Sequence, residues 1–173
     1  MPLIREETPD DVESIRQVNR AAFGAEAEAH LVDRLRSEGL VITSLVAVED
    51  GRIVGHILFS ELPVETKDGL LRVAALAPMA VLPEFQLRGI GSALVGHGLA
   101  ACRERGQVGV LVVGHPAYYP RFGFSAAAAK KLLSPFSGDA WMALEFVPGA
   151  LAGVAGTVRY PEAFGPVGEQ PHS

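Results

Sequence analysis

The sequence predicts one α/β domain with a mixed, mostly antiparallel sheet flanked by helices. The chain has 173 residues, which suits a single domain, and 49% hydrophobic residues supply a substantial core. Two β-rich runs separated by Asp50-Gly51 indicate a tight antiparallel hairpin. A buried strand ending at Val81, a helix over 90–105 and a strand over 108–113 then follow in order, which implies a right-handed parallel crossover.

The N-terminal part is predicted to form a short strand over 3–5 and two helices. The first helix begins with Thr8 as N-cap and Pro9 in its first turn. Its apolar residues recur at helical spacing at Val12, Ile15, Val18 and Ala22. The second helix runs from about 25 to 37 and ends before Gly39. Its predicted buried face consists of Ala27, Leu31 and Leu35.

The remaining elements follow from apolar runs and turn residues. A loop is predicted around Pro63 and 67–69, and a central strand buried on both faces over 70–81, interrupted by Pro78. In the helix over 90–105, His97 lies on the apolar stripe and is predicted to be a core residue. Residues 141–146 form a last strand, and 157–160 an edge strand.

Composition excludes several classes of protein. A formal net charge of −5 argues against nucleic acid as the main partner. Cys102 is the single cysteine, so no disulfide forms within the chain, which suits a reducing compartment. The N-terminus lacks the apolar core of a signal peptide, and no run of about 18 apolar residues exists. We therefore expect a cytoplasmic location.

The segment from Met79 to Leu94 is the strongest candidate for a binding site. It predicts a strand end, a proline-marked turn, a loop with Gly89 and Gly91, and a helix start, which together form an anion site. The dinucleotide fingerprint would need a third glycine where Leu94 stands. The P-loop would need a lysine after its last glycine, and none is present.

What remains is Gln-x-x-Gly-x-Gly, formed by Gln86, Gly89 and Gly91, with Tyr119-x-x-x-Gly-Phe further along the chain. This arrangement resembles the acyl-CoA-binding signature of the GNAT superfamily of N-acetyltransferases, over residues 4 to about 146. The run over 116–124 and the strand over 142–145 resemble its YhbS-like branch. The resemblance implies a GNAT-type acyl-CoA N-acyltransferase fold with a splayed central strand and acetyl-CoA as co-substrate, without a metal.

The resemblance also implies roles for particular residues. Tyr119 would be the catalytic acid that protonates the leaving thiolate, which leaves Tyr118 to pack in the core. A backbone N–H, of Val81 or else Met79, would stabilise the carbonyl oxygen. The cofactor-binding residues carried over from the family are Met79, Ala80, Val81, Gln86, Leu87, Arg88, Gly89, Ile90, Gly91 and Ser92.

One family feature is missing, because residues 70–81 contain no acidic residue to take the proton of the amine. The alternatives are a water chain or one of Glu28, His30, His56, Glu84 and His115. We expect Glu28, His30 and Glu84 to be solvated, and His56 and His115 to be structural. His115 also stands where many relatives carry asparagine, which puts its contact to the cofactor in question.

The expected function is transfer of the acetyl group of acetyl-CoA to a primary amine of a small molecule or protein. The alternatives are a CoA-binding sensor with this fold and little turnover, and an acyltransferase with another acyl group or an oxygen acceptor. We expect an acetyltransferase domain over 1–147 and a Gly/Pro-rich extension over 148–173, packed on or trailing from that domain. Neither nucleic acid nor a membrane is expected as a partner, and a homodimer remains open.

Overall fold

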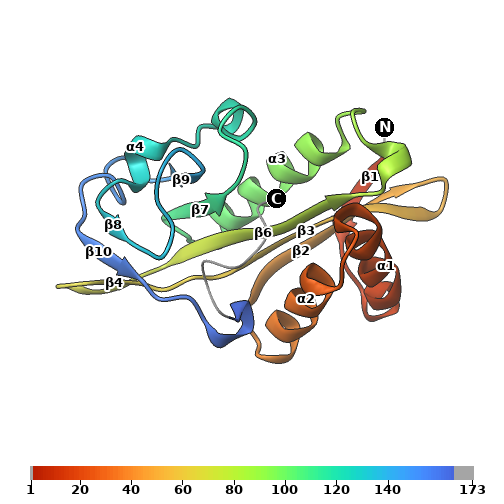
Figure 1. Ribbon diagram of the computed structural model, residues 1–173, viewed down its shortest axis with the longest axis horizontal. Helices are drawn as coiled ribbons and strands as arrows, with labels where there is room; N and C mark the ends of the chain where they lie inside the picture. Colours follow the sequence, from red (N-terminus) through yellow and green to blue (C-terminus); the bar gives the residue numbers. More distant parts are fainter. Residues whose placement is uncertain (1, 166–173) are drawn as a thin grey trace. The chain divides into compact units, whose positions relative to one another are not determined.

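The computed structural model describes residues 2–165 and divides into two compact units (Figure 1). The first unit holds the chain up to Ser60 and residues Ala77–Ala101. The second unit holds Glu61–Leu76 and the chain from Cys102 onward. Strand β6 (Val73–Val81) and helix α3 (Ile90–Glu104) each run through both units. The last eight residues of the predicted extension, 166–173, lie outside the described residues.

The first unit combines an antiparallel sheet with helices on both faces. Its strand order is β1-β2-β3-β6. Besides its parts of β6 and α3, its elements are β1 (Leu3–Glu6), η1 (Pro9–Asp11), α1 (Val12–Phe23), α2 (Ala27–Ser37), β2 (Val41–Glu49), β3 (Arg52–Glu61) and η2 (Pro83–Phe85).

The hairpin between β2 and β3 forms as predicted. Glu49 pairs with Arg52 in register, which leaves a two-residue turn. Asp50 and Gly51 both have positive φ, 50° and 75°, as a primed turn requires. The predicted helix start is confirmed as well, because the Thr8 N–H donates to Asp11 Oδ2 at 2.7 Å, although the first turn is a 3-10 helix.

Helix α2 buries a different face from the predicted one. Its buried residues are Glu28, Ala29, Val32 and Leu35. Ala27 is exposed and Leu31 is half-buried, so two of the three predicted positions are wrong. The buried stripe begins one residue later, a rotation of roughly 100° about the helix axis. Gly39 follows the helix with φ 71°, as predicted.

The side chains of β3 show which helices cover which face of the sheet. His56 points toward α1, where it contacts Asn19. Its neighbour Gly55 faces α3, because a Cβ at Gly55 would lie 3.0 Å from Leu94 Cδ1. Since successive strand residues point to opposite faces, α1 and α3 cover opposite faces of this sheet (Figure 1).

The second unit contains two small sheets. One has the order β6-β7-β9 and the other β5-β4-β10-β8. Its further elements are β4 (Val64–Thr66), β5 (Gly69–Leu71), β7 (Gly109–Val113), η3 (Tyr119–Phe122), α4 (Ala126–Ala129), β8 (Leu132–Leu133), β9 (Trp141–Glu145), β10 (Gly156–Val158) and η4 (Glu162–Phe164).

The second sheet overturns three predictions. The predicted continuous strand over 70–81 is divided at Arg72 into β5 and β6. The predicted loop before it contains β4, which pairs with β5 as a hairpin. The predicted edge strand near 157 lies between β4 and β8 instead. Close approach there depends on Gly156, where a Cβ would lie 2.8 Å from Val64 Cγ1.

Strands β6 and β7 pair in parallel, which confirms the predicted crossover. Their ladder covers only Val73–Ala75 and Gly109–Leu111. Strand β7 continues to pair with β9 up to Val113, but Leu76 of β6 has no partner on β7. The ladder therefore ends early on the β6 side, as expected of a splayed central strand. The peptide bond between Ala77 and Pro78 is cis.

The described part of the predicted extension, 148–165, belongs to the second unit. Leu151 is fully buried and Phe164 is 5% exposed. The backbone N–H groups of Leu151 and Ala152 donate to Glu145 Oε2 at 2.8 and 2.7 Å. The Ala152 N–H and then the Leu151 N–H hold the pKa of Glu145 below its ordinary value.

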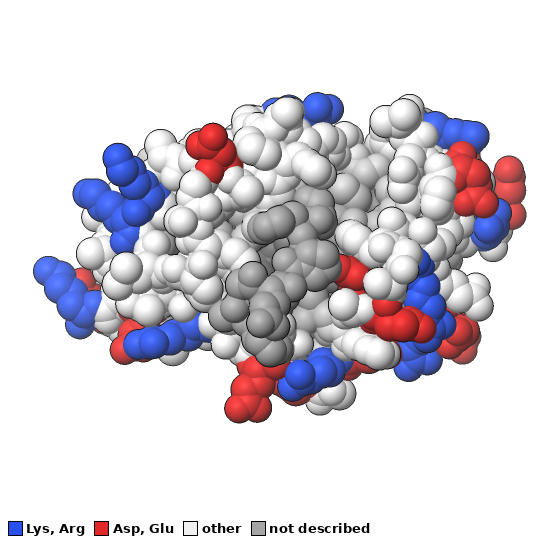
Figure 2. Space-filling model, viewed as in Figure 1, with Lys and Arg blue, Asp and Glu red and all other residues white. Residues whose placement is uncertain are grey.

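Charged side chains of both signs are interspersed on the face shown in Figure 2, and neither forms a continuous field there. Within the described residues, no helix has the length and apolar character needed to cross a membrane.

Candidate active site

The glycine loop between β6 and α3 presents a row of backbone N–H groups. Leu87 and Gly89 have positive φ, 63° and 84°, so the backbone turns sharply before α3. Within the described part of the chain, no group accepts a hydrogen bond from the N–H of residues 87–91. The first N–H groups of a helix have no partner within the helix, and the helix dipole is positive there. The loop therefore has N–H donors without a described acceptor at the place where the sequence predicts an anion site.

The predicted cofactor-binding residues around this loop differ in exposure. Leu87, Arg88, Gln86 and Gly89 are exposed, whereas Ile90 is 3% exposed and anchors the start of α3. Gly91, Ser92 and Met79 are half-buried, and Ala80 and Val81 are buried. An exposed loop on a buried anchor is open to a ligand without losing its shape.

Two side chains bracket the loop. Gln86 Nε2 donates to the Val81 carbonyl at 3.0 Å, which ties the loop back to the end of β6. The Arg88 guanidinium lies 5.0 Å from the centre of the Phe85 ring, within cation–π range. Gln86 therefore shapes the loop, while Arg88 places positive charge beside it.

Tyr119 lies in the second unit, in η3, and is 1% exposed. Its ring packs edge to face against Tyr118 and Phe124, with centroids 5.1 and 5.6 Å apart. Tyr118 is only half-buried, and the Arg121 guanidinium stacks on it at 4.5 Å. The prediction that Tyr118 is the core tyrosine is wrong, because the 3-10 turn directs Tyr119 inward.

Three of the five candidate bases are exposed. These are His30, Glu84 and His115. The predictions for His30 and Glu84 are confirmed, and Glu84 lies 3.9 Å from Arg52. The prediction of a structural His115 is wrong, because it lies exposed after β7. His97 is exposed too, not in the core, with Nδ1 2.9 Å from the Ala93 carbonyl oxygen.

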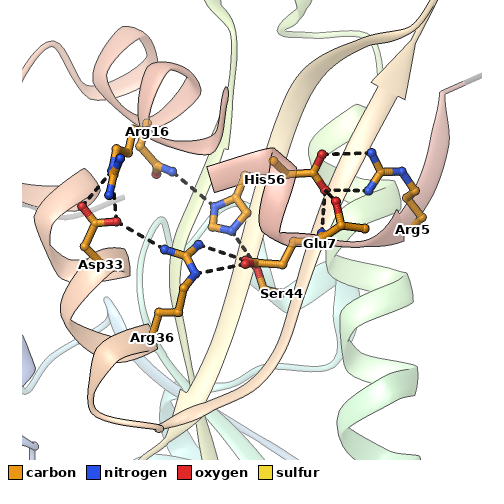
Figure 3. A network of polar contacts seen from close by, with 10 residues as sticks. Arg5, Glu7, Arg16, Asp33, Arg36, Ser44 and His56 are labelled. Carbon is orange, nitrogen blue, oxygen red and sulfur yellow. Dashed lines mark hydrogen bonds and ion pairs between the residues drawn. The ribbon is translucent and has the colours of Figure 1, made fainter. Parts of the chain in front are cut away.

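His56 is fully buried, and both its ring nitrogens are occupied (Figure 3). Asn19 Nδ2 donates to the Ile15 carbonyl at 3.0 Å and lies 3.2 Å from His56 Nδ1. Because that carbonyl can only accept, Nδ2 is the donor and Nδ1 accepts. The ring proton is therefore on Nε2, which lies 2.9 Å from Ser44 Oγ.

The hydrogen bonds continue from Ser44 to the surface of the unit (Figure 3). Ser44 Oγ donates to the Glu7 carboxylate, and Arg36 Nε holds that carboxylate at 3.0 Å. Burial, with a smaller effect of Arg36, lowers the pKa of His56 to about 3. A ring that is neutral, buried and bonded at both nitrogens is structural, as predicted, and does not take a proton from a substrate.

Glu28 contradicts the prediction of a solvated residue. It is 6% exposed, and its Oε1 is buried without a hydrogen-bond partner. No described residue forms an ion pair or hydrogen bond with its side chain. The sequence could have indicated this position, because Glu28, Val32 and Leu35 share one helix face.

Other reactive groups offer no alternative chemistry. Cys102 is fully buried, and burial raises the pKa of its thiol to about 12, so it is not a nucleophile. Among residues 2–165, no group of three or more His, Cys, Asp and Glu side chains could hold a metal ion.

Comparison with known proteins identifies the family of this chain. Residues 3–127 match the family model of the acetyltransferase (GNAT) domain, and the chain belongs to this family. It is 38% identical to the uncharacterized N-acetyltransferase YhbS of Escherichia coli K12, over 94% of this chain and 98% of YhbS.

Two solved structures are also similar. The crystal structure of Escherichia coli YhbS in complex with CoA has a TM-score of 0.86 at 37% identity, covering 96% of this chain and 93% of that one. A GNAT acetyltransferase from Brucella melitensis in complex with acetyl-CoA has a TM-score of 0.80 at 36% identity, covering 95% and 98%. The GNAT fold and the resemblance to YhbS are thereby confirmed.

Proposed function

We propose that this protein transfers the acetyl group of acetyl-CoA to a primary amine of a small molecule or protein by direct attack. The observation that carries the proposal is the row of unpartnered N–H groups over 87–91 at the start of α3. Those donors suit the pyrophosphate of CoA. The complexes of the two similar proteins with CoA and acetyl-CoA support the same assignment.

The pyrophosphate would be held by the backbone from Leu87 to Ser92, with Arg88 adding charge. Gln86 would keep the loop in position through its bond to Val81. The backbone of Met79, Ala80 and Val81 would pair with the pantetheine arm, and the N–H of Val81 would face the carbonyl oxygen. The pairing of β6 with β7 ends at Ala75, which supports the proposal that later backbone N–H and C=O groups of β6 can bond a ligand.

In the reaction, the nitrogen of the neutral amine attacks the thioester carbonyl carbon. The carbon–sulfur bond then breaks, and Tyr119 protonates the departing CoA thiolate. A tyrosine hydroxyl is a proton donor and can serve as that acid. The excess proton on the nitrogen passes to a base, and the products are the N-acetyl amine and CoA.

The test is release of the CoA thiol across a panel of primary amines, measured with a thiol reagent. Cys102 is buried and contributes little background. Tyr119→Phe is expected to lower kcat by ~10²–10⁴. Tyr118→Phe is the matched control, because this neighbouring ring is half-buried, and it is expected to keep most activity.

Two outcomes would contradict the proposal in different ways. Thermal stabilisation by acetyl-CoA without thiol release against any amine would indicate a CoA-binding sensor. Thiol release that survives Tyr119→Phe with little loss would remove the acid role of Tyr119 but leave acetyl transfer in place. Faster release with longer acyl-CoAs, or with alcohols as acceptors, would indicate a different acyltransferase.

We further propose a cytoplasmic location, supported by the buried, single Cys102. We also propose that the acetyltransferase domain covers residues 1–147 and that the extension from 148 packs on it. The burial of Leu151 and Phe164 supports that packing.

A further inference from the structure

Glu28 lies in the first turn of α2, in the same unit as the glycine loop. The residue is 6% exposed. A buried carboxylate normally has a cation or several N–H donors as partners, because moving an unpaired charge out of water is unfavourable. An unpartnered carboxylate at this depth therefore needs an explanation.

The other buried carboxylate of the described chain, Asp11, has such a partner, and so does the half-buried Glu7. Asp11 is held by two nitrogens of Arg5, at 2.7 and 3.1 Å. Glu7 is held by Arg36 and Ser44. Glu49 also has an unpartnered oxygen, but its residue is half-exposed, in the hairpin. Glu28 thus combines deep burial with the lack of a partner.

Glu28 stands at the N-terminal end of α2, an 11-residue helix, where the helix dipole favours a negative side chain. No described cation or N–H donor contacts its carboxyl group, so the described residues provide no positive partner for it. The chemistry that completes it is a cation with N–H donors, and a protonated primary amine is such a group.

Glu28 could also supply the base that the reaction needs, since a protonated amine must lose a proton before it attacks. Strand β6 contains no acidic residue, and His56 is occupied at both nitrogens. His30, Glu84 and His115 are exposed. Among the five candidates, Glu28 alone is buried with a carboxyl group that no described residue bonds.

We propose that Glu28 binds the ammonium group of the acceptor and takes its proton, which leaves the neutral amine to attack the thioester. The inference rests on the proposed function and specifies its acceptor as a cationic primary amine. One N–H bond of the ammonium breaks, and one O–H bond forms on Glu28. That proton returns to water when the N-acetyl product leaves.

The test is the pH dependence of kcat/KM for Glu28→Gln and the wild type over about pH 6.5 to 9.5. Glutamine keeps the shape of the side chain but removes its basicity. At neutral pH, the variant is expected to lose ~10²-fold or more. The loss should shrink as the pH approaches the pKa of the acceptor, because the amine then arrives already neutral.

Glu26→Gln is the matched control, since Glu26 lies two residues earlier with an exposed side chain. It is expected to keep the wild-type profile. Glu28→Asp is expected to recover part of the activity with the wild-type pH dependence. Circular dichroism and thermal melting of each variant separate loss of function from loss of fold.

A Glu28→Gln profile parallel to that of the wild type, or a change of less than about threefold, would overturn the inference and leave the proposed function intact. If the wild type releases no thiol with any amine, the amine panel is tested by thermal shift in the presence of CoA. Stabilisation of the wild type but not of Glu28→Gln would support the ammonium site, and equal or absent shifts in both would overturn it.

Discussion

The first unit contains two polar regions that differ in how many of their hydrogen-bonding groups have partners. In the glycine loop, no described group accepts a hydrogen bond from the N–H groups of residues 87–91. In the network around His56, both ring nitrogens are bonded within the fold and the ring is fully buried. Unused donors indicate a ligand, whereas satisfied groups indicate a structural role.

This difference shows that the type of a side chain alone does not predict its role. A histidine is the side chain usually suspected of proton transfer, yet burial and saturation remove His56 from that role. Residues 87–91 contain no titratable side chain apart from Arg88, but their backbone N–H groups have no described acceptor. The availability of a polar group therefore indicates function better than its chemical type does.

The largest expected effect comes from replacing Gly89 in the glycine loop with a β-branched residue. Gly89 has φ 84°, a conformation that valine adopts only with strain of about 1–3 kcal/mol. Since a Cβ added at this position would have no heavy atom within 4 Å, the effect comes from the backbone and not from a collision. We expect Gly89→Val to weaken binding of CoA by ~10²-fold in titration calorimetry, and unchanged affinity would contradict the anion site.

The next prediction concerns the pH dependence that His56 imposes on stability. Its pKa is about 3 in the fold, against an ordinary value of 6.5, so between these values the unfolded chain binds more protons. Stability therefore decreases as the pH falls through this window, by about 2 kcal/mol from pH 6.5 to 5. His56→Gln is expected to flatten this slope in urea unfolding, and an equally steep slope would show that other groups cause it.

A third comparison uses two glycines of α3. A Cβ at Gly98 would overlap the Phe59 ring, whereas Gly96 has open space around its Cα. We expect Gly98→Ala to destabilise the fold by about 1–3 kcal/mol through overpacking. Gly96→Ala should stabilise it by up to about 1 kcal/mol through helix propensity. Equal shifts in melting temperature would contradict this distinction.

The smallest expected effect is at the Arg5–Asp11 pair, which also holds the start of α1. The hydrogen bond from Arg5 is the main cause that lowers the pKa of Asp11 to about 2. Its stabilisation is present above about pH 4, the unfolded value, and is lost as the pH falls toward 2. Asp11→Asn is expected to cost about 1 kcal/mol at pH 7, because Arg5 is partly exposed.

The Asp11→Asn difference should become small near pH 2, where about half of the wild-type carboxylate is protonated in the fold. Denaturant unfolding at both pH values checks this. A difference that stays constant across the range would show that the amide changes the first turn by some route other than charge.

Local patterns predicted a large part of the fold. Asp50-Gly51 indicated its hairpin, Thr8 and Pro9 a helix start, and Gly39 a helix end, because each depends on a few neighbouring residues. Gln86, Gly89 and Gly91 predict an anion site for the same reason, and this stays a prediction. Each of these signals depends on a few residues that are neighbours in the sequence, so it can be read without the tertiary structure.

Other predictions failed where distant segments decide the outcome. The division of the apolar run at Arg72 depends on pairing of β5 with β4, and the inner place of β10 depends on β8. Ala27 was predicted to be buried and is exposed, whereas Glu28 was predicted to be solvated and is buried. The face that a helix buries depends on the elements it packs against and not on the helix alone. Periodicity alone cannot set this rotation to within one residue.

The sequence by itself determined the class of protein and the place of its donor loop, since backbone conformation at glycine and the helix start are local properties. Only the tertiary structure decided which side chains remain available. It joined Asn19, Ser44 and Glu7 around His56 from separate elements, and it left Glu28 buried without a partner. The physical reason is that burial and partnering depend on long-range packing, which no short stretch of chain specifies.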